Sequence, residues 1–290
     1  MQNRYLIGIL IVIAGGACLS TSGILIRLLD DAQGWQIILY RSITFFFTIL
    51  AVVVFKYRRR TLDAYAAIGD YGIIAAILLS LGSVMYIFAI LNTTVANVVF
   101  IIGSAPLVTA LLAWIILREK VSGWSLVAMV AAVAGIGLMF LDGLVSGGML
   151  GNLLALSMVF MFAFYLLILR NQRDIDMVPA TGLSGLITFC IAAWMVQELS
   201  ISLHDLVICI LLGSFQFGLG FLLLTLGTRF LPAAEVALFA MSESILNPIW
   251  VWIWVDEVPS AYTLYGSAIV LVSVVVYSVI AIRTERVESS

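Results

Sequence analysis

Polar side chains recur every four residues near the end of this chain. Glu235, Phe239, Glu243 and Asn247 fall on one helical face, because four residues make about one turn, and Ser242 lies beside them. A helix surrounded by lipid would not carry two carboxylates on one face, so the stripe predicts a helix that lines a cavity. We predict Glu243 as a substrate or proton site. Glu235 is either a second proton site or an acid at the solvated membrane interface.

Arg41 is a cation within an apolar run, about two turns from the start of that run. A charged group at this depth costs several kcal/mol unless it is paired or hydrated. Two interpretations fit the sequence. Arg41 is either the counter-charge of a carboxylate, in a substrate or in Glu243, or a structural clasp that binds backbone carbonyls and helix ends.

Further polar groups inside apolar runs complete the predicted cavity. Each can line a substrate cavity or form an interhelical hydrogen bond or packing contact, and the sequence leaves both roles open. These groups are Asn97, Ser104, Tyr86, Gln216 and Tyr165.

The elements that must position these residues are membrane-spanning helices. Of the 290 residues, 63% are hydrophobic and 10% are charged, against about 25% charged in a typical soluble domain. Membrane lipid is therefore an expected partner, and the net charge of −2 gives no indication of nucleic acid. Runs of ~20 apolar residues can cross the bilayer, and we predict ten, at residues 5–26, 35–55, 71–91, 95–117, 124–141, 151–169, 179–197, 206–228, 233–255 and 260–282.

The distribution of positive charge predicts the orientation of these spans. If the N-terminus is cytoplasmic, the inner segments hold 12 of the 14 lysines and arginines. An outer loop then holds Arg27, and Arg41 lies within a span. By the positive-inside rule both termini are cytoplasmic, as an even number of spans also requires. The inner cations are Arg4, Lys56, Arg58, Arg59, Arg60, Arg118, Lys120, Arg170, Arg173, Arg229, Arg283 and Arg286.

An internal repeat divides the predicted helices into two halves. A shift of 138 residues places Trp114 on Trp252 and Glu119 on Glu257. Each half has an odd number of spans, so the halves insert in opposite orientations, an architecture typical of transporters. We therefore expect an all-α membrane protein of ten transmembrane helices in two inverted five-helix repeats. Its parts are residues 1–141 (first repeat), 142–150 (connecting loop), 151–283 (second repeat) and 284–290 (cytoplasmic tail).

The end of the fourth span resembles the drug/metabolite transporter superfamily, specifically the EamA-type ten-helix permeases. The segment from Ala105-Pro106 to Ser122 is similar to that family's proline, apolar run and terminal Leu-Gly-Glu motif, with Arg118 in place of the usual glycine. The second copy departs more, because Glu243-Ser244 stands where Glu-Pro is common. The resemblance implies a carrier of amino acids, other metabolites or xenobiotics, frequently an exporter.

Other classes of protein fit the sequence less well. We expect no enzyme, cofactor or metal site, because no P-loop, dinucleotide motif or histidine cluster occurs and Cys18, Cys190 and Cys209 read as small apolar core residues. A receptor would need larger extramembrane surfaces. The expected function is a secondary transporter, most simply an exporter, of a small-molecule substrate in the bacterial inner membrane, as a monomer or homodimer. The alternatives are an uptake permease, an exchanger of the same fold, or a channel.

Overall fold

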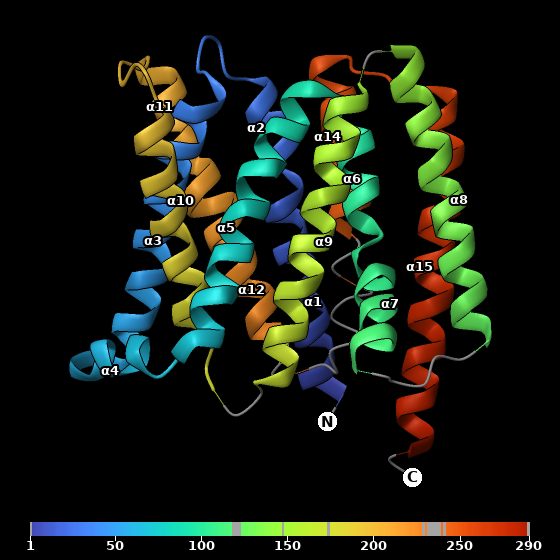
Figure 1. Ribbon diagram of the computed structural model, residues 1–290, viewed down its shortest axis with the longest axis horizontal. Helices are drawn as coiled ribbons and strands as arrows, with labels where there is room; N and C mark the ends of the chain where they lie inside the picture. Colours follow the sequence, from blue (N-terminus) through green and yellow to red (C-terminus); the bar gives the residue numbers. More distant parts are fainter. Residues whose placement is uncertain are drawn as a thin grey trace.

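The computed structural model describes residues 2–117, 123–146, 148–172, 175–227, 230, 239 and 242–288, and these residues form a helical bundle with no strand among them (Figure 1). The helices are α1 (Gln2–Ser20), α2 (Ser22–Arg27), α3 (Gly34–Tyr57), α4 (Thr61–Ala66), α5 (Gly69–Asn92), α6 (Val95–Gly103), α7 (Ala105–Leu117), α8 (Gly123–Ser146), α9 (Met149–Asn171), α10 (Val178–Met195), α11 (Leu203–Leu211), α12 (Gly220–Gly227), α14 (Ser242–Val255) and α15 (Ala261–Glu288), with a 3₁₀ turn η1 (Arg58–Arg60) and a π-helix η2 (Leu212–Leu219).

Seven helical segments of the described chain are long and apolar enough to cross a membrane. They correspond to the first four predicted spans and to the sixth, seventh and eighth. Leu126–Leu141 and Ala261–Tyr277 are shorter apolar helices, in the fifth and tenth predicted spans. Part of the ninth predicted span lies outside the described residues. The helical membrane fold is therefore confirmed, and the number of ten spans stays a prediction.

Three of the predicted spans are interrupted. The first breaks at Thr21, where the Ser20 and Thr21 hydroxyls donate to the carbonyls of Ala17 and Cys18. The fourth breaks at Ser104, just before Pro106, whose ring nitrogen has no hydrogen to donate to a preceding carbonyl. The eighth contains the π-helix η2, a rare form that frequently occurs at functional sites. Hydrophobic periodicity did not predict these interruptions, because a broken span keeps the same apolar composition.

The joints between helices are short. A hairpin joins α5, which ends at Asn92, to α6, which begins at Val95, in agreement with the predicted span bounds 71–91 and 95–117. Helix α8 continues to Ser146 and α9 begins at Met149, so helices extend into the predicted connecting loop 142–150. Glycine is tolerated in membrane helices, where water does not compete for the backbone hydrogen bonds.

The bundle has two edges, which we name from the orientation of Figure 1. The lower edge carries η1, α4, the start of α1 and the end of α15, and the upper edge carries the ends of α2 and α14. Helix α1 starts at the lower edge, whereas α9 starts at the upper edge. Between the edges α5 packs on α9, α10 on α3, and α1 on both α12 and α14. Helices from both ends of the sequence therefore meet in the interior.

Candidate functional site

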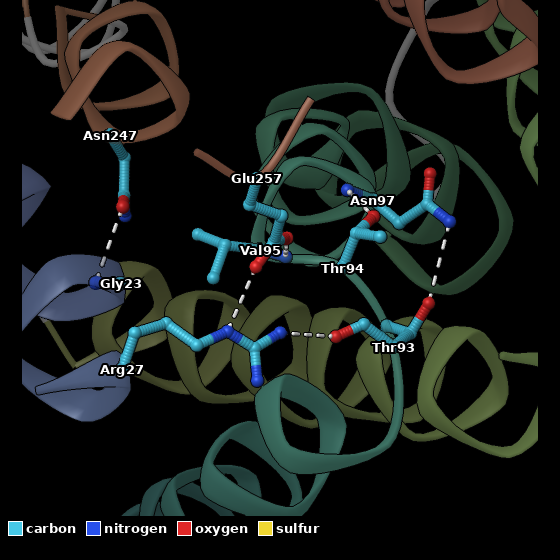
Figure 2. A network of polar contacts seen from close by, with 8 residues as sticks. All are labelled: Gly23, Arg27, Thr93, Thr94, Val95, Asn97, Asn247 and Glu257. Atoms are coloured by element: carbon cyan, nitrogen blue, oxygen red, sulfur yellow. Dashed lines mark hydrogen bonds and ion pairs between the residues drawn. The ribbon is translucent and has the colours of Figure 1, made fainter. Parts of the chain in front are cut away.

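An ion-paired cluster at the upper edge joins the end of α2, the start of α6 and the loop after α14. Arg27, at the end of α2, donates from Nε to Glu257 Oε2 at 2.9 Å and from Nη2 to the Thr93 carbonyl at 2.9 Å (Figure 2). The other Glu257 oxygen accepts the Val95 N–H at 2.7 Å. Arg27 and Glu257 side chains are only 25% and 20% exposed. We name Arg27, Thr93, Val95 and Glu257 the upper latch.

Asn97 extends this upper cluster sideways. Its Oδ1 accepts the Thr263 hydroxyl at 2.6 Å, and its Nδ2 donates to Thr93 Oγ1 at 3.4 Å. Thr93 in turn donates to Asn152 Oδ1 at 3.0 Å. Asn97 was predicted as a cavity residue. In the structure it is fully buried and bonded to Thr263 of α15 and to Thr93 between α5 and α6.

A second polar cluster fills the break between α1 and α2. The Tyr86 hydroxyl donates to Ser22 Oγ at 2.6 Å, and Asn247 Nδ2 donates to the same oxygen at 2.9 Å. Asn247 Oδ1 accepts the Gly23 N–H at 3.2 Å (Figure 2). Trp250 Nε1 donates to Ser20 Oγ at 3.0 Å. We name these residues the kink cluster, and it brings together two of the predicted site residues, Tyr86 and Asn247.

The rest of the predicted stripe lies next to the kink cluster. Glu243 is half-buried one turn before Asn247, within electrostatic reach of Tyr86. The Ser242 hydroxyl is buried with no hydrogen-bond partner among the described residues, and Phe239 packs against Val12 of α1. The stripe therefore faces the first span, while Glu235 lies outside the described residues.

Arg41 lies between α3, α5 and η2, away from the upper latch and beside the Tyr86 ring of the kink cluster. Only 4% of the residue is exposed. Its Nη1 donates to Ser83 Oγ at 2.9 Å, and its guanidinium carbon lies 4.6 Å from the Phe217 ring centroid and 5.6 Å from that of Tyr86. Arg41 lines a small cavity with, among others, Ser42, Ser83, Ser184, Thr188 and Phe217. We name this the Arg41 pocket.

Three predicted cavity residues have bonds elsewhere. Gln216, in η2 beside Phe217, donates to the Leu19 carbonyl of α1 at 3.2 Å. Ser104 donates to the Ile101 carbonyl at the break between α6 and α7. Tyr165 shares a 3.0 Å hydrogen bond with Thr181 between α9 and α10. Through α1, Gln216 approaches the kink cluster. These hydrogen bonds of Ser104 and Tyr165 involve neither cluster nor the Arg41 pocket.

The lower edge has its own clasp at Asp176, before α10. Its Oδ2 accepts from Lys56 and from the Tyr57 hydroxyl, and its Oδ1 accepts the Val178 N–H at 3.0 Å. Partial burial raises the pKa of the Asp176 carboxyl, but the hydrogen bonds from Lys56, Tyr57 and Val178 outweigh this and lower the pKa below its ordinary value. Asp176 therefore ties the end of α3 to the start of α10 most strongly when it is ionised.

One group of acidic and histidine side chains in the described part of the chain is close enough to hold a metal ion. Asp30, His204 and Asp205 offer ligand atoms within 4.8 Å of one another. The buried Asp205 carboxylate, however, already accepts the N–H groups of Asp30 and Asp31. Asp205 thus has a clear structural role in holding the loop after α2.

Free cysteines differ in exposure. Cys209 is buried and Cys18 is half-buried, as expected for small core residues, but Cys190 is exposed on the bundle surface. The prediction of a core position was wrong for Cys190, because an apolar run in a membrane protein contains lipid-facing as well as buried positions.

Sequence patterns did not predict the partners that complete these clusters. Ser22, Ser83 and Thr93 bond to predicted residues, yet none of them was singled out. The run Ser20-Thr21-Ser22 in the middle of an apolar span is a signal that was available. The pairing of Arg27 with Glu257 was also accessible, since both fall at the same predicted membrane surface.

Comparisons with known proteins agree with this architecture. The sequence profile of the EamA-like transporter family matches residues 6–141 and 149–279. The chain is 26% identical over 211 residues, 66% of its length, to solute carrier family 35 member G1 of Mus musculus, and it spans 56% of that relative's length. A chain in a solved crystal structure is similar in fold, with a TM-score of 0.66 and 16% identity over 96% of this chain and 98% of the other.

Proposed function

The chain belongs to the EamA-like transporter family, and from this premise we propose that it is a secondary transporter. It moves a small metabolite, such as an amino acid or a related compound, across the bacterial inner membrane by alternating access, in the outward direction. This family belongs to the drug/metabolite transporter superfamily. Substrate, direction and mechanism are the parts that we propose.

The upper latch is the observation that carries this proposal. Its ion pair connects α2, from the first matched segment, to the loop after α14, from the second. A carrier needs a contact between its halves that closes one side and breaks when that side opens. Arg27 and Glu257 fit this role, because a partly exposed pair can exchange its bonds for water at modest cost.

We also propose an inverted arrangement of ten spans, which suits the same mechanism. We propose that residues 1–141 and 151–283 are the two repeats, joined by 142–150. The opposite starting edges of α1 and α9 are as such an arrangement requires (Figure 1). The exposed cations Arg58, Arg59 and Arg60 at the lower edge favour a cytoplasmic location for that edge, for both termini and for the tail 284–290. The upper edge is then the outer face.

Glu243 is the residue that we propose for proton coupling or substrate binding. It is acidic, half-buried and next to the kink cluster, where a change in its charge would be felt by Tyr86. Glu235 remains a second candidate. Asn247, Ser242, Gln216, Asn97, Ser104 and Tyr165 remain proposed cavity residues. The functional unit is a monomer or homodimer that needs no cofactor or nucleic acid.

Transport in proteoliposomes tests the proposal. We expect saturable uptake that is accelerated by unlabelled substrate on the opposite side, because a carrier exchanges its substrate and a channel does not. Candidate substrates come from a thermal-shift screen of the purified protein against amino acids and metabolites, since a ligand of the folded state raises its melting temperature. Flux that stays linear with concentration and shows no exchange would contradict the carrier mechanism.

Variants of the latch connect the transport to its proposed structural basis. Glu257→Gln should change the rate of exchange and expose Cys18 to a membrane-impermeant thiol reagent added from the outer side. Glu198→Gln is the matched control, because Glu198 is an exposed carboxylate at the same edge. Equal labelling in both variants would show that the latch does not close the outer side. Reporter fusions after residues 60 and 286 should read cytoplasmic, and one after 147 periplasmic.

A further inference from the structure

We propose that the Arg41 pocket binds an oxyanion group of the transported substrate, a carboxylate or a phosphate. This proposal rests on the proposed transport function and names the chemical class of its substrate. The guanidinium of Arg41 is the charge that selects the anion, and Ser83 is the hydroxyl that helps to orient it.

The first argument is the missing counter-charge. Arg41 begins the third turn of α3, seven residues or ~10 Å from the start of the helix, so its side chain lies within the apolar depth of the bundle. None of the ion pairs found in the described chain includes Arg41. A buried cation without an anion is costly, and such residues in membrane proteins generally have a functional partner.

The contacts of Arg41 compensate its charge only in part. Ser83 accepts one hydrogen bond, and the faces of Phe217 and Tyr86 add cation–π attraction. A clasp would instead bind backbone carbonyls, as Arg27 does at Thr93. Arg41 donates to no backbone carbonyl of the described residues, and its buried Nε–H has no described acceptor. The arginine is therefore held in position but not satisfied.

The second argument is the set of donors at the pocket. Ser83 Oγ accepts from Arg41, so its own hydroxyl hydrogen remains for a ligand, and it donates to no described residue. Together with Arg41 Nε–H it gives two donors beside one cavity. Two donors of this kind, one of them charged, suit a carboxylate or phosphate oxygen better than an amine, which would be repelled by the guanidinium.

The third argument is the π-helix that forms one wall. Gly213 of η2 lies so close to α3 that an added Cβ would collide with the Thr44 side chain and the Arg41 carbonyl. The same element places Phe217 against the guanidinium. The cavity beside Arg41 and Phe217 has a volume of about 10 Å³, room for about one water molecule. The described conformation is thus closed around Arg41, and a substrate enters when α3 and η2 separate.

The test uses the protein purified in a maltoside detergent and a phosphate-free buffer. Melting temperatures are measured with acetate, succinate, citrate, glutamate and inorganic phosphate at equal ionic strength, and with acetamide and succinamide as uncharged counterparts. Wild type is compared with Arg41→Met, which keeps much of the side-chain volume without the charge, and with Arg41→Lys. Arg59→Met is the control, since Arg59 is an exposed cation at the lower edge. The same anions are then offered as substrates in proteoliposomes.

We expect at least one anion to stabilise wild type and Arg59→Met saturably, and its uncharged counterpart to have no effect. Arg41→Met should weaken the binding of that anion by about tenfold or more. Arg41→Lys should weaken it by less, because lysine keeps the charge but loses the planar fork of the guanidinium. Without any anion, Arg41→Met should melt at or above the temperature of wild type, because it removes an unpaired buried charge.

Several outcomes would overturn the proposal. Arg41 would be a clasp if Arg41→Met melts at a lower temperature than wild type without anion and if no anion raises the melting temperature of wild type. Stabilisation by phosphatidylglycerol vesicles but by no soluble anion would assign the pocket to a lipid headgroup. Exchange of a cationic or neutral solute alone would leave the transport function standing and refute the anion site, whereas anion binding without any transport would refute the transport function and leave the site standing.

Discussion

Arg27 and Arg41 have opposite surroundings, although only fourteen residues separate them in the chain. Arg27 is 25% exposed, and its charge is met by Glu257 and by the Thr93 carbonyl. Arg41 is 4% exposed, and its hydrogen-bond partner is one neutral hydroxyl. A charge that is needed for structure is expected to be satisfied within the protein. The contrast agrees with our proposals that Arg27 joins the two halves and that Arg41 binds a ligand.

The largest effect should come from η2, which contributes Phe217 to the lining of the Arg41 pocket. Gly213→Ala should destabilise the protein by about 1–3 kcal/mol, because the new methyl group overlaps backbone of α3. Gly137→Ala is the control, as nothing lies within 4 Å of the added methyl. Thermal unfolding of both variants gives the comparison. If Gly213→Ala is as stable as Gly137→Ala, η2 is not tightly packed on α3. The missing partner of Arg41 would then be weaker evidence for a ligand site.

Breaking the upper latch should have the next largest effect. Glu257→Gln should cost about 2 kcal/mol, since it weakens one charge-assisted bond to Arg27 and one to the Val95 N–H. Arg27→Met should cost a similar amount, and the double variant should cost less than the sum of the two. A double-mutant cycle from thermal unfolding measures this coupling. If the effects of the two single variants simply add, Arg27 and Glu257 are not coupled. Arg27 would then be no better paired than Arg41.

Tyr86→Phe separates the kink cluster from the Arg41 pocket. It removes the 2.6 Å bond to Ser22 and should cost about 1 kcal/mol, while the ring remains under Arg41. The melting temperature should therefore fall, and its rise on addition of the stabilising anion should be unchanged. An anion response that disappears with the hydroxyl would place Tyr86 Oη among the ligand's donors.

The smallest effect is expected at Asp176, a satisfied charge at the lower edge. Its pKa is lower in the folded protein than in the unfolded chain, so its stabilisation is full above the unfolded value of about 3.9 and is lost as the pH falls through the folded value. Asp176→Asn should cost about 1 kcal/mol or less at pH 7. Unfolding measured from pH 7 to about pH 2 should show the difference between wild type and variant shrinking once the pH falls below the unfolded pKa. Parallel curves would contradict the ion-pair role.

Sequence reasoning succeeded where a single segment contains its own signal. Apolar length predicted the seven long apolar segments of the described chain, and the polar residues Asn92, Thr93 and Thr94 mark the hairpin between α5 and α6. The stripe on α14 placed Asn247 correctly on a face with Glu243. These features depend on periodicity and composition, which act within one helix.

The parts that were missed depend on contacts between distant segments. Ser22 lies 64 residues from Tyr86 and 225 from Asn247, and no local pattern links the three. The sequence left both interpretations of Arg41 open for the same reason, because only its neighbours in space distinguish a clasp from a binding group. The π-helix was equally inaccessible, since its residues have an ordinary apolar composition.

The break at Thr21 also has a consequence for the order of biosynthesis. Ser20, Thr21 and Ser22 leave the ribosome long before α14, which supplies Asn247 and Trp250. Until then the hydroxyls of Ser20 and Thr21 are satisfied by their own carbonyls at Ala17 and Cys18, so the first span can enter lipid without them. Ser22 acquires its α14 partner only near the end of translation. A stalled nascent chain that ends before α14 should therefore hold α2 less firmly than the finished protein.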